Sequence, residues 1–109
     1  MGSFGTVEDD ATFDEKANGP DLVIAKFQTK GCVICRRVEP ALKQLIERTP
    51  ELNCLINVDA EDNASLAGRF NIRGVPTLIL LKDGQELARC NGFQTSAMLR
   101  DWIAPFLKC

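Results

Sequence analysis

Two cysteines separated by two residues, Cys32 and Cys35, stand between two different hydrophobic patterns. The preceding run, Leu22–Phe27, has the length and apolar character of a buried strand. After the cysteines, apolar residues recur at helical spacing as far as Arg48. This order predicts a strand that leads into a helix, with the cysteine pair at the helix N-terminus. The first N–H groups of a helix have no partner within it, so this position favours a negatively charged sulfur.

The size and composition of the chain are typical of one globular domain. It has 109 residues, of which 45% are hydrophobic, and we expect a single domain over residues 1–109. Thirteen basic and fifteen acidic residues leave a net charge of −2, which predicts neither a nucleic-acid nor a membrane partner. No apolar run approaches the ~18 residues that a membrane span needs. We therefore expect a monomer with no membrane association.

The side chains that are present limit the possible chemistry and location. The sequence contains no histidine, which excludes histidine-assisted cysteine or serine catalysis within this chain. Its five cysteines are an odd number in a domain that can build a core without disulfides. The N-terminus lacks the basic and apolar parts of a secretion signal. We therefore expect a cytoplasmic location, where a Cys-x-x-Cys pair is more often catalytic or metal-binding than structural.

Turn and capping residues divide the chain into alternating helices and strands. The expected elements are, in order, a short helix capped by Asp9 or Asp10 and ending near Asn18, a strand over 22–28, a helix over 32–48, a strand over 53–58, a helix over 64–70, strands over 77–81 and 86–91, and a last helix capped by Thr95 or Ser96. Strands joined through helices pair in parallel, whereas Asp83-Gly84 predicts an antiparallel hairpin. The fold class is therefore α/β, a mixed sheet with helices on both faces.

Helical phase distinguishes the two thiols. Cys35 shares a stripe with apolar residues that must face the sheet, namely Val38, Leu42 and Leu45. Cys35 is therefore expected to be the inner thiol, and Cys32, in the first turn, the more accessible one. Nearby cations further favour a thiolate at Cys32: Lys30, Arg36 and Arg37. We expect Cys32 to attack a disulfide and Cys35 to resolve the mixed disulfide that forms.

A Cys-x-x-Cys pair can also be half of a zinc or iron–sulfur site, or an inert structural feature. A tetrahedral site would need two further ligands from Cys54, Cys90 and Cys109, none of which forms a second pair. This favours redox chemistry with no bound metal. Cys54 is expected to be a small core residue, and Cys90 either an edge-strand packing residue or a regulatory thiol. Cys109, at the C-terminus, is expected to be exposed.

The chain resembles the thioredoxin family over essentially its whole length. The resemblance rests on the cysteine pair after the central strand and on four further features: Pro40 in the following helix, the segment 72–77, the turn 82–84, and Gly92. It implies the thioredoxin fold, a central mixed sheet of four to five strands flanked by helices on both faces. It also implies a cis Val75–Pro76 bond whose loop lies against the cysteines.

The same resemblance implies an activity and its partners. The activity is that of a thiol–disulfide oxidoreductase with disulfide-containing protein substrates, without a bound cofactor. A flavin-dependent disulfide reductase is the implied candidate for electron donor. The substrate's extended chain would be bound by backbone pairing along the proline loop, which is a form of strand addition. The residues implied in substrate binding are Gly31, Val33, Ile34, Val75, Pro76 and Gly92.

The sequence departs from the family pattern around the cysteines. Gly31-Cys32-Val33-Ile34-Cys35 stands where family members resemble Trp-Cys-Gly-Pro-Cys, so the aromatic is lost at Gly31 and two apolar residues, Val33 and Ile34, replace the Gly-Pro between the sulfurs. Lys26 stands where the family has a buried acid, and the lysine partner of that acid aligns with Leu55. A buried cation would stabilise thiolates, so we expect Lys26, with Arg36, to make the pair more oxidising. The alternative is a solvated lysine at a strand end.

Two non-catalytic functions stay open at this point. In this fold, a Cys-x-x-Cys pair without the intervening proline can bridge a metal or an iron–sulfur cluster in a dimer. The apolar rim of Val33 and Ile34 could also serve a protein-interaction adaptor.

Overall fold

The computed structural model describes residues 3–7 and 9–107. The elements in chain order are β1 (Ser3–Val7), α1 (Asp10–Ala17), β2 (Leu22–Gln28), α2 (Val33–Arg48), β3 (Leu52–Asp59), α3 (Ala64–Arg69), β4 (Thr77–Lys82), β5 (Gln85–Asn91), α4 (Ser96–Ile103) and a 3-10 turn (Ala104–Phe106). All the elements expected from Asp9 onward are present, and the bounds that were expected differ from the observed ones by at most two residues. Pro105 falls in the 3-10 turn, where the regular helix has ended.

The strand β1 was not expected from the sequence. Ser3–Val7 is short and contains a glycine, so it carries little intrinsic preference for a strand. It pairs in parallel with β3, from Ser3 beside Cys54 to Val7 beside Val58. Its strand conformation therefore depends on backbone hydrogen bonds to a segment about fifty residues away, which local sequence patterns do not report.

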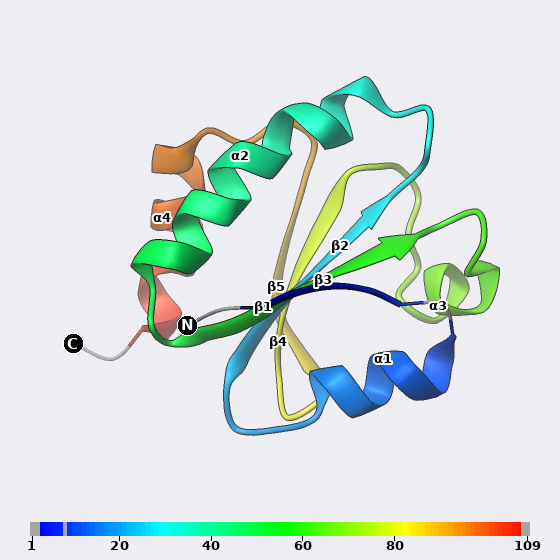
Figure 1. Ribbon diagram of the computed structural model, residues 1–109, viewed down its shortest axis with the longest axis horizontal. Coiled ribbons are helices and arrows are strands. Elements are labelled where there is room, and N and C mark those ends of the chain that lie inside the picture. Colours follow the sequence, from blue (N-terminus) through cyan, green and yellow to red (C-terminus); the bar gives the residue numbers. More distant parts are fainter. Residues whose placement is uncertain (1–2, 8, 108–109) are drawn as a thin grey trace.

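The five strands form one mixed sheet in the order β1-β3-β2-β4-β5. β1, β3 and β2 run parallel, while β4 is antiparallel to both β2 and β5. Figure 1 shows α2 and α4 over one face of the sheet and α1 and α3 over the other. The predicted α/β architecture with helices on both faces is confirmed, with five strands at the upper end of the expected number. None of the described helices is long and apolar enough to span a bilayer.

The central strand β2 contributes to both layers of the core. Val23, Ala25 and Phe27 belong to the cluster that packs under α1 and α3. Leu22 and Ile24 belong to the other cluster, under α2 and α4. This alternation follows from the period of two along a strand. The helix that carries the cysteines is therefore held on the sheet by a continuous apolar layer, which fixes the position of its N-terminus.

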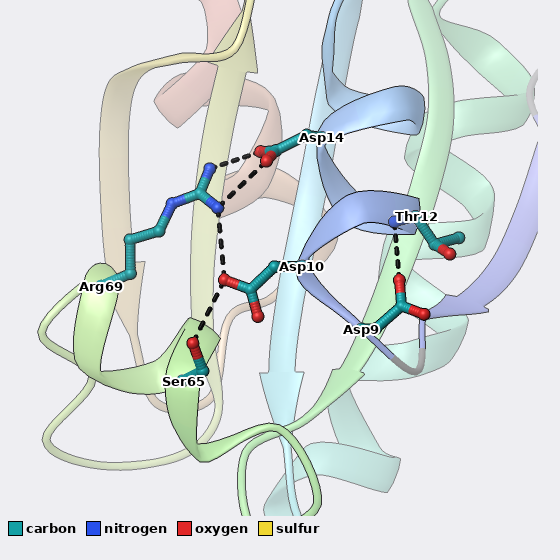
Figure 2. A network of polar contacts seen from close by, with 6 residues as sticks. All are labelled: Asp9, Asp10, Thr12, Asp14, Ser65 and Arg69. Carbon is teal, nitrogen blue, oxygen red and sulfur yellow. Dashed lines mark hydrogen bonds and ion pairs between the residues drawn. The ribbon is translucent and has the colours of Figure 1, made fainter.

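A polar network fastens α1 to α3 on the other side of the sheet (Figure 2). The Asp9 carboxylate caps α1 by accepting a hydrogen bond from the Thr12 backbone N–H. Arg69 of α3 forms ion pairs with Asp10 and Asp14 of α1, and Ser65 donates to Asp10. These side chains are partly exposed, so each pair contributes only about 0.2–1 kcal/mol. The network orients two short helices and lies on the face opposite α2.

Candidate functional site

The two cysteines form a disulfide at the start of α2, with their Cα atoms 5.3 Å apart. Cys32 has extended backbone geometry and is the N-cap, so the helix begins at Val33, one residue later than expected. The Cys35 side chain is 1% exposed, whereas Cys32 is half-buried. The burial of the two sulfurs therefore differs in the direction that helical phase predicted.

The helix N-terminus is directed at the sulfur of Cys32. The Cys35 backbone N–H donates a hydrogen bond to Cys32 Sγ at 3.1 Å. Amide donors and the helix dipole both stabilise a thiolate at such a position once the disulfide is reduced. The arrangement thus places an accessible sulfur at a helix N-terminus next to a buried second sulfur.

The proline loop lies at the same edge of the sheet as the cysteines. The Val75–Pro76 peptide bond is cis, as the family resemblance implied. Thr77, the first residue of β4, pairs with Phe27 near the end of β2, after which the chain turns into Cys32. The Gly92 N–H donates to the Pro76 carbonyl at 2.9 Å. Three of the residues implied in substrate binding, Val75, Pro76 and Gly92, are therefore neighbours in the structure.

An apolar surface is exposed on the segments at this edge of the sheet. Val33 and Ile34 are 56% and 46% exposed, as their position between the cysteines suggested. Gly31 and Arg36 are also exposed. Phe93, which directly follows Gly92, is 50% exposed and was missed by sequence reasoning. An aromatic residue next to a glycine of the family pattern was the available signal.

A partly buried ion pair joins β2 to α2 one helical turn after the inner thiol. Lys26 is fully buried in β2, and its ammonium group pairs with the Glu39 carboxylate of α2. The alternative of a solvated lysine at a strand end is therefore wrong. Glu39 was not identified from the sequence, although it lies one helical turn after Cys35. The residue beside Lys26 on β3 is Asn57, whereas Leu55, which stands where the family has a lysine, lies beside Ile24.

Lys30 is already engaged by an acidic partner. Its ammonium group lies 3.2 Å from the Asp62 carboxylate, and both side chains are exposed. The hydrogen bond to Asp62, with the charges of Asp62 and Asp59, raises the pKa of Lys30 above its ordinary value. The positive charge is thus shared with the loop after β3, so Lys30 contributes less to a Cys32 thiolate than its sequence position suggested.

The described cysteines outside the pair are placed as packing residues. Cys54 is buried in the core under α1 and α3. Cys90, on β5, is half-buried against the core under α2 and α4. Cys109 lies outside the described residues. Within the described ranges, no group of three or more Cys, Asp or Glu side chains is arranged to hold a metal ion.

Burial raises the pKa of the Cys90 thiol to about 11. At pH 8 only about one thiol in a thousand is then ionised, and iodoacetamide reacts with the thiolate. We expect Cys90 in the folded Cys32→Ser/Cys35→Ser/Cys109→Ser protein to be alkylated about 100-fold more slowly than an exposed cysteine, measured by peptide mass spectrometry. The rate should rise with pH up to about 11, and unfolding in urea should remove the difference. Rapid labelling of the folded protein at pH 8 would instead indicate a regulatory thiol.

Comparisons with known proteins agree with this geometry. The Thioredoxin family model matches residues 5–105. A thioredoxin from Rhodospirillum rubrum is 32% identical over 97 residues, which cover 86% of this chain and 91% of that protein. Protein disulfide-isomerase 1 from Caenorhabditis elegans is 31% identical over 97 residues, but the chain spans only 20% of its length. The solved structure of a mutant thioredoxin from Halobacterium salinarum NRC-1 superimposes with a TM-score of 0.88 at 29% identity, covering 98% of this chain and 93% of that one.

Proposed function

This chain belongs to the thioredoxin family of thiol–disulfide oxidoreductases, and we propose that it exchanges two electrons with disulfide-containing proteins through Cys32 and Cys35. The observation that carries the proposal is the asymmetry of the pair. One sulfur is accessible and faces a helix N-terminus, and the other is buried directly behind it. The metal-binding and adaptor alternatives are not favoured, because the relatives are thioredoxins and a disulfide isomerase.

The proposed exchange proceeds in two steps. The Cys32 thiolate attacks one sulfur of the substrate disulfide, which breaks that bond, forms a mixed disulfide and releases the other substrate sulfur as a thiolate. Cys35, after losing its proton, attacks the Cys32 sulfur, which forms the Cys32–Cys35 disulfide and releases the second substrate thiolate. The two electrons of the dithiol have then passed to the substrate, whose sulfurs take up protons from solvent.

We propose that the substrate binds along the exposed edge formed by the cysteine and proline loops. The residues involved are Gly31, Val33, Ile34, Val75, Pro76, Gly92 and Phe93. The apolar side chains would cover an extended segment of the substrate, and backbone groups next to Pro76 would pair with it as an added strand. The exposure of Val33, Ile34 and Phe93 supports this assignment, because large exposed apolar groups at one edge are typical of a protein contact.

The cations near the pair are proposed to tune its redox equilibrium. Lys26, fully buried under α2, and Arg36, in the first turn of that helix, would both stabilise the thiolate of the reduced form. Their effect is to raise the reduction potential, so that the pair is a better oxidant than it would be without them. Arg36 is exposed and screened by solvent, which makes Lys26 the stronger of the two.

We further propose a monomeric protein of one domain over residues 1–109 that works in the cytoplasm. A monomer suffices because both sulfurs come from one chain. Cys90 is not in a disulfide, which supports a reducing compartment. The electron donor would be a flavin-dependent disulfide reductase, because reduction of the Cys32–Cys35 disulfide needs two electrons from a further partner.

The reduction of insulin disulfides tests the proposal. With dithiothreitol as electron donor, the protein should accelerate the precipitation of insulin, and Cys32→Ser should abolish the acceleration. Cys90→Ser is the matched control and should retain it. Failure of the wild-type protein to accelerate insulin reduction, with a Cys32–Cys35 pair shown to be reduced, would contradict the activity on protein disulfides.

A further inference from the structure

The ion pair between Lys26 and Glu39 occupies a defined place under the active-site helix. Lys26 lies in the middle strand of the sheet and is 0% exposed. Its neighbours in register are Asn57 on β3 and Leu78 on β4. Asn57 Oδ1 is buried and has no hydrogen-bond partner among the described residues. Glu39 is thus the ion-pair partner of a fully buried lysine, and this ion pair places the positive charge beside α2.

Glu39 connects this charge to the helix that carries the cysteines. It lies four residues after Cys35, so the two side chains project from the same face of α2 in successive turns. Its side chain is 28% exposed, unlike that of Lys26. The carboxylate therefore reaches the buried ammonium from the rim of the helix while keeping part of its surface in solvent.

We propose that Glu39 is a positioning residue that sets the reduction potential of the Cys32–Cys35 pair by neutralising Lys26. The proposal rests on the proposed function, because it concerns the same dithiol. It also revises the expectation drawn from the sequence. An unpaired Lys26 would raise the potential strongly, whereas the pair with Glu39 limits that increase.

The sign of the effect follows from the charges of the two redox states. Reduction of the disulfide by two glutathione molecules forms one glutathione disulfide and leaves a dithiol at Cys32 and Cys35. A thiolate can form only in the reduced state, whereas the disulfide carries no charge. A positive charge in a buried, weakly screened site therefore stabilises the reduced state, and a negative charge opposes it. Removing Glu39 should favour the dithiol, and removing Lys26 should favour the disulfide.

The experiment equilibrates the wild-type protein and its variants with glutathione buffers at pH 7 and measures the fraction of Cys32–Cys35 disulfide by thiol trapping and mass spectrometry. Glu39→Gln should shift the equilibrium about tenfold or more towards the dithiol, equivalent to about 30 mV. Lys26→Met should shift it towards the disulfide. The double variant should lie within about threefold of wild type, because both charges are absent. Glu47→Gln, an exposed acid on the same helix, is the matched control and should not differ from wild type.

A Glu39→Gln protein that is no easier to reduce than wild type would overturn the proposal. The same holds if the Lys26→Met/Glu39→Gln protein has the same dithiol–disulfide equilibrium as Glu39→Gln alone. If Glu39→Gln does not fold, the Lys26→Met variant tests the proposal instead. A dithiol–disulfide equilibrium equal to that of wild type in Lys26→Met would then contradict it. The potential compares two folded states, so a loss of stability common to both does not move it. The readout uses glutathione and no protein substrate, so it stays valid if the insulin assay fails.

Discussion

A Cys35→Ser protein is expected to accumulate as a mixed disulfide between Cys32 and its protein substrate. Cys35 is buried behind Cys32, so it is the sulfur placed to complete the exchange, and serine cannot attack a disulfide. The rate of insulin reduction should fall by about 100-fold or more. Removal of a single catalytic residue in other enzymes lowers the rate by at least this much. The covalent complex should be visible on a non-reducing gel and should disappear on addition of dithiothreitol.

Two further variants are the controls for this experiment. Cys32→Ser should lose turnover without forming the mixed disulfide, because the attacking sulfur is absent. Cys90→Ser should behave as wild type, since the half-buried Cys90 thiol has a raised pKa and takes no part in the exchange. A mixed disulfide formed through Cys35 in the Cys32→Ser protein would reverse the proposed order of the two sulfurs.

The second large effect concerns stability and comes from the unequal burial of the ion pair. Glu39→Gln should destabilise the fold by about 3–5 kcal/mol, because it leaves an uncompensated ammonium group in a fully buried site. Lys26→Met should cost much less, since the remaining Glu39 carboxylate is partly exposed and can be hydrated. The double variant should be close to wild type or more stable, because an apolar side chain of similar length then fills the site. Urea unfolding followed by circular dichroism measures all three.

The control for this series is again Glu47→Gln, which should change the free energy of unfolding by less than about 0.5 kcal/mol. Equal destabilisation by Glu39→Gln and Lys26→Met would contradict the unequal burial. It would mean that the carboxylate is as poorly hydrated as the ammonium group. The potential and the stability are independent measurements, so the same variants test two separate consequences of one contact.

Particular elements show which expectations could be made without the structure. The strand β2 and the helix α2 carry strong periodic patterns, and the capping by Asp9 and Thr95 is a local signal. The relative burial of Cys32 and Cys35 also follows from the local period of a helix. By contrast, β1 has no such pattern, and its pairing with β3 is a long-range contact.

The neighbours of Lys26 could not be obtained in the same way. Its strand partner Asn57 depends on the register between β2 and β3 and lies two residues after Leu55, the position that aligns with the family's lysine. Its ion-pair partner Glu39 depends on how α2 is placed on the sheet. Neither partner can be obtained from spacing along the chain, because β3 and α2 are placed beside Lys26 only by the packing of the whole domain.

The sequence by itself determined the order of most elements, the position of the cysteines at a helix start, and which sulfur is buried. These features depend on the periods of helices and strands and on capping residues, all of which act over a few residues. Only the tertiary structure decided that Lys26 is fully buried and neutralised by a glutamate of the helix that carries the cysteines. That contact joins a strand to a helix across the core, where burial removes the solvent screening that would otherwise make the charge unimportant.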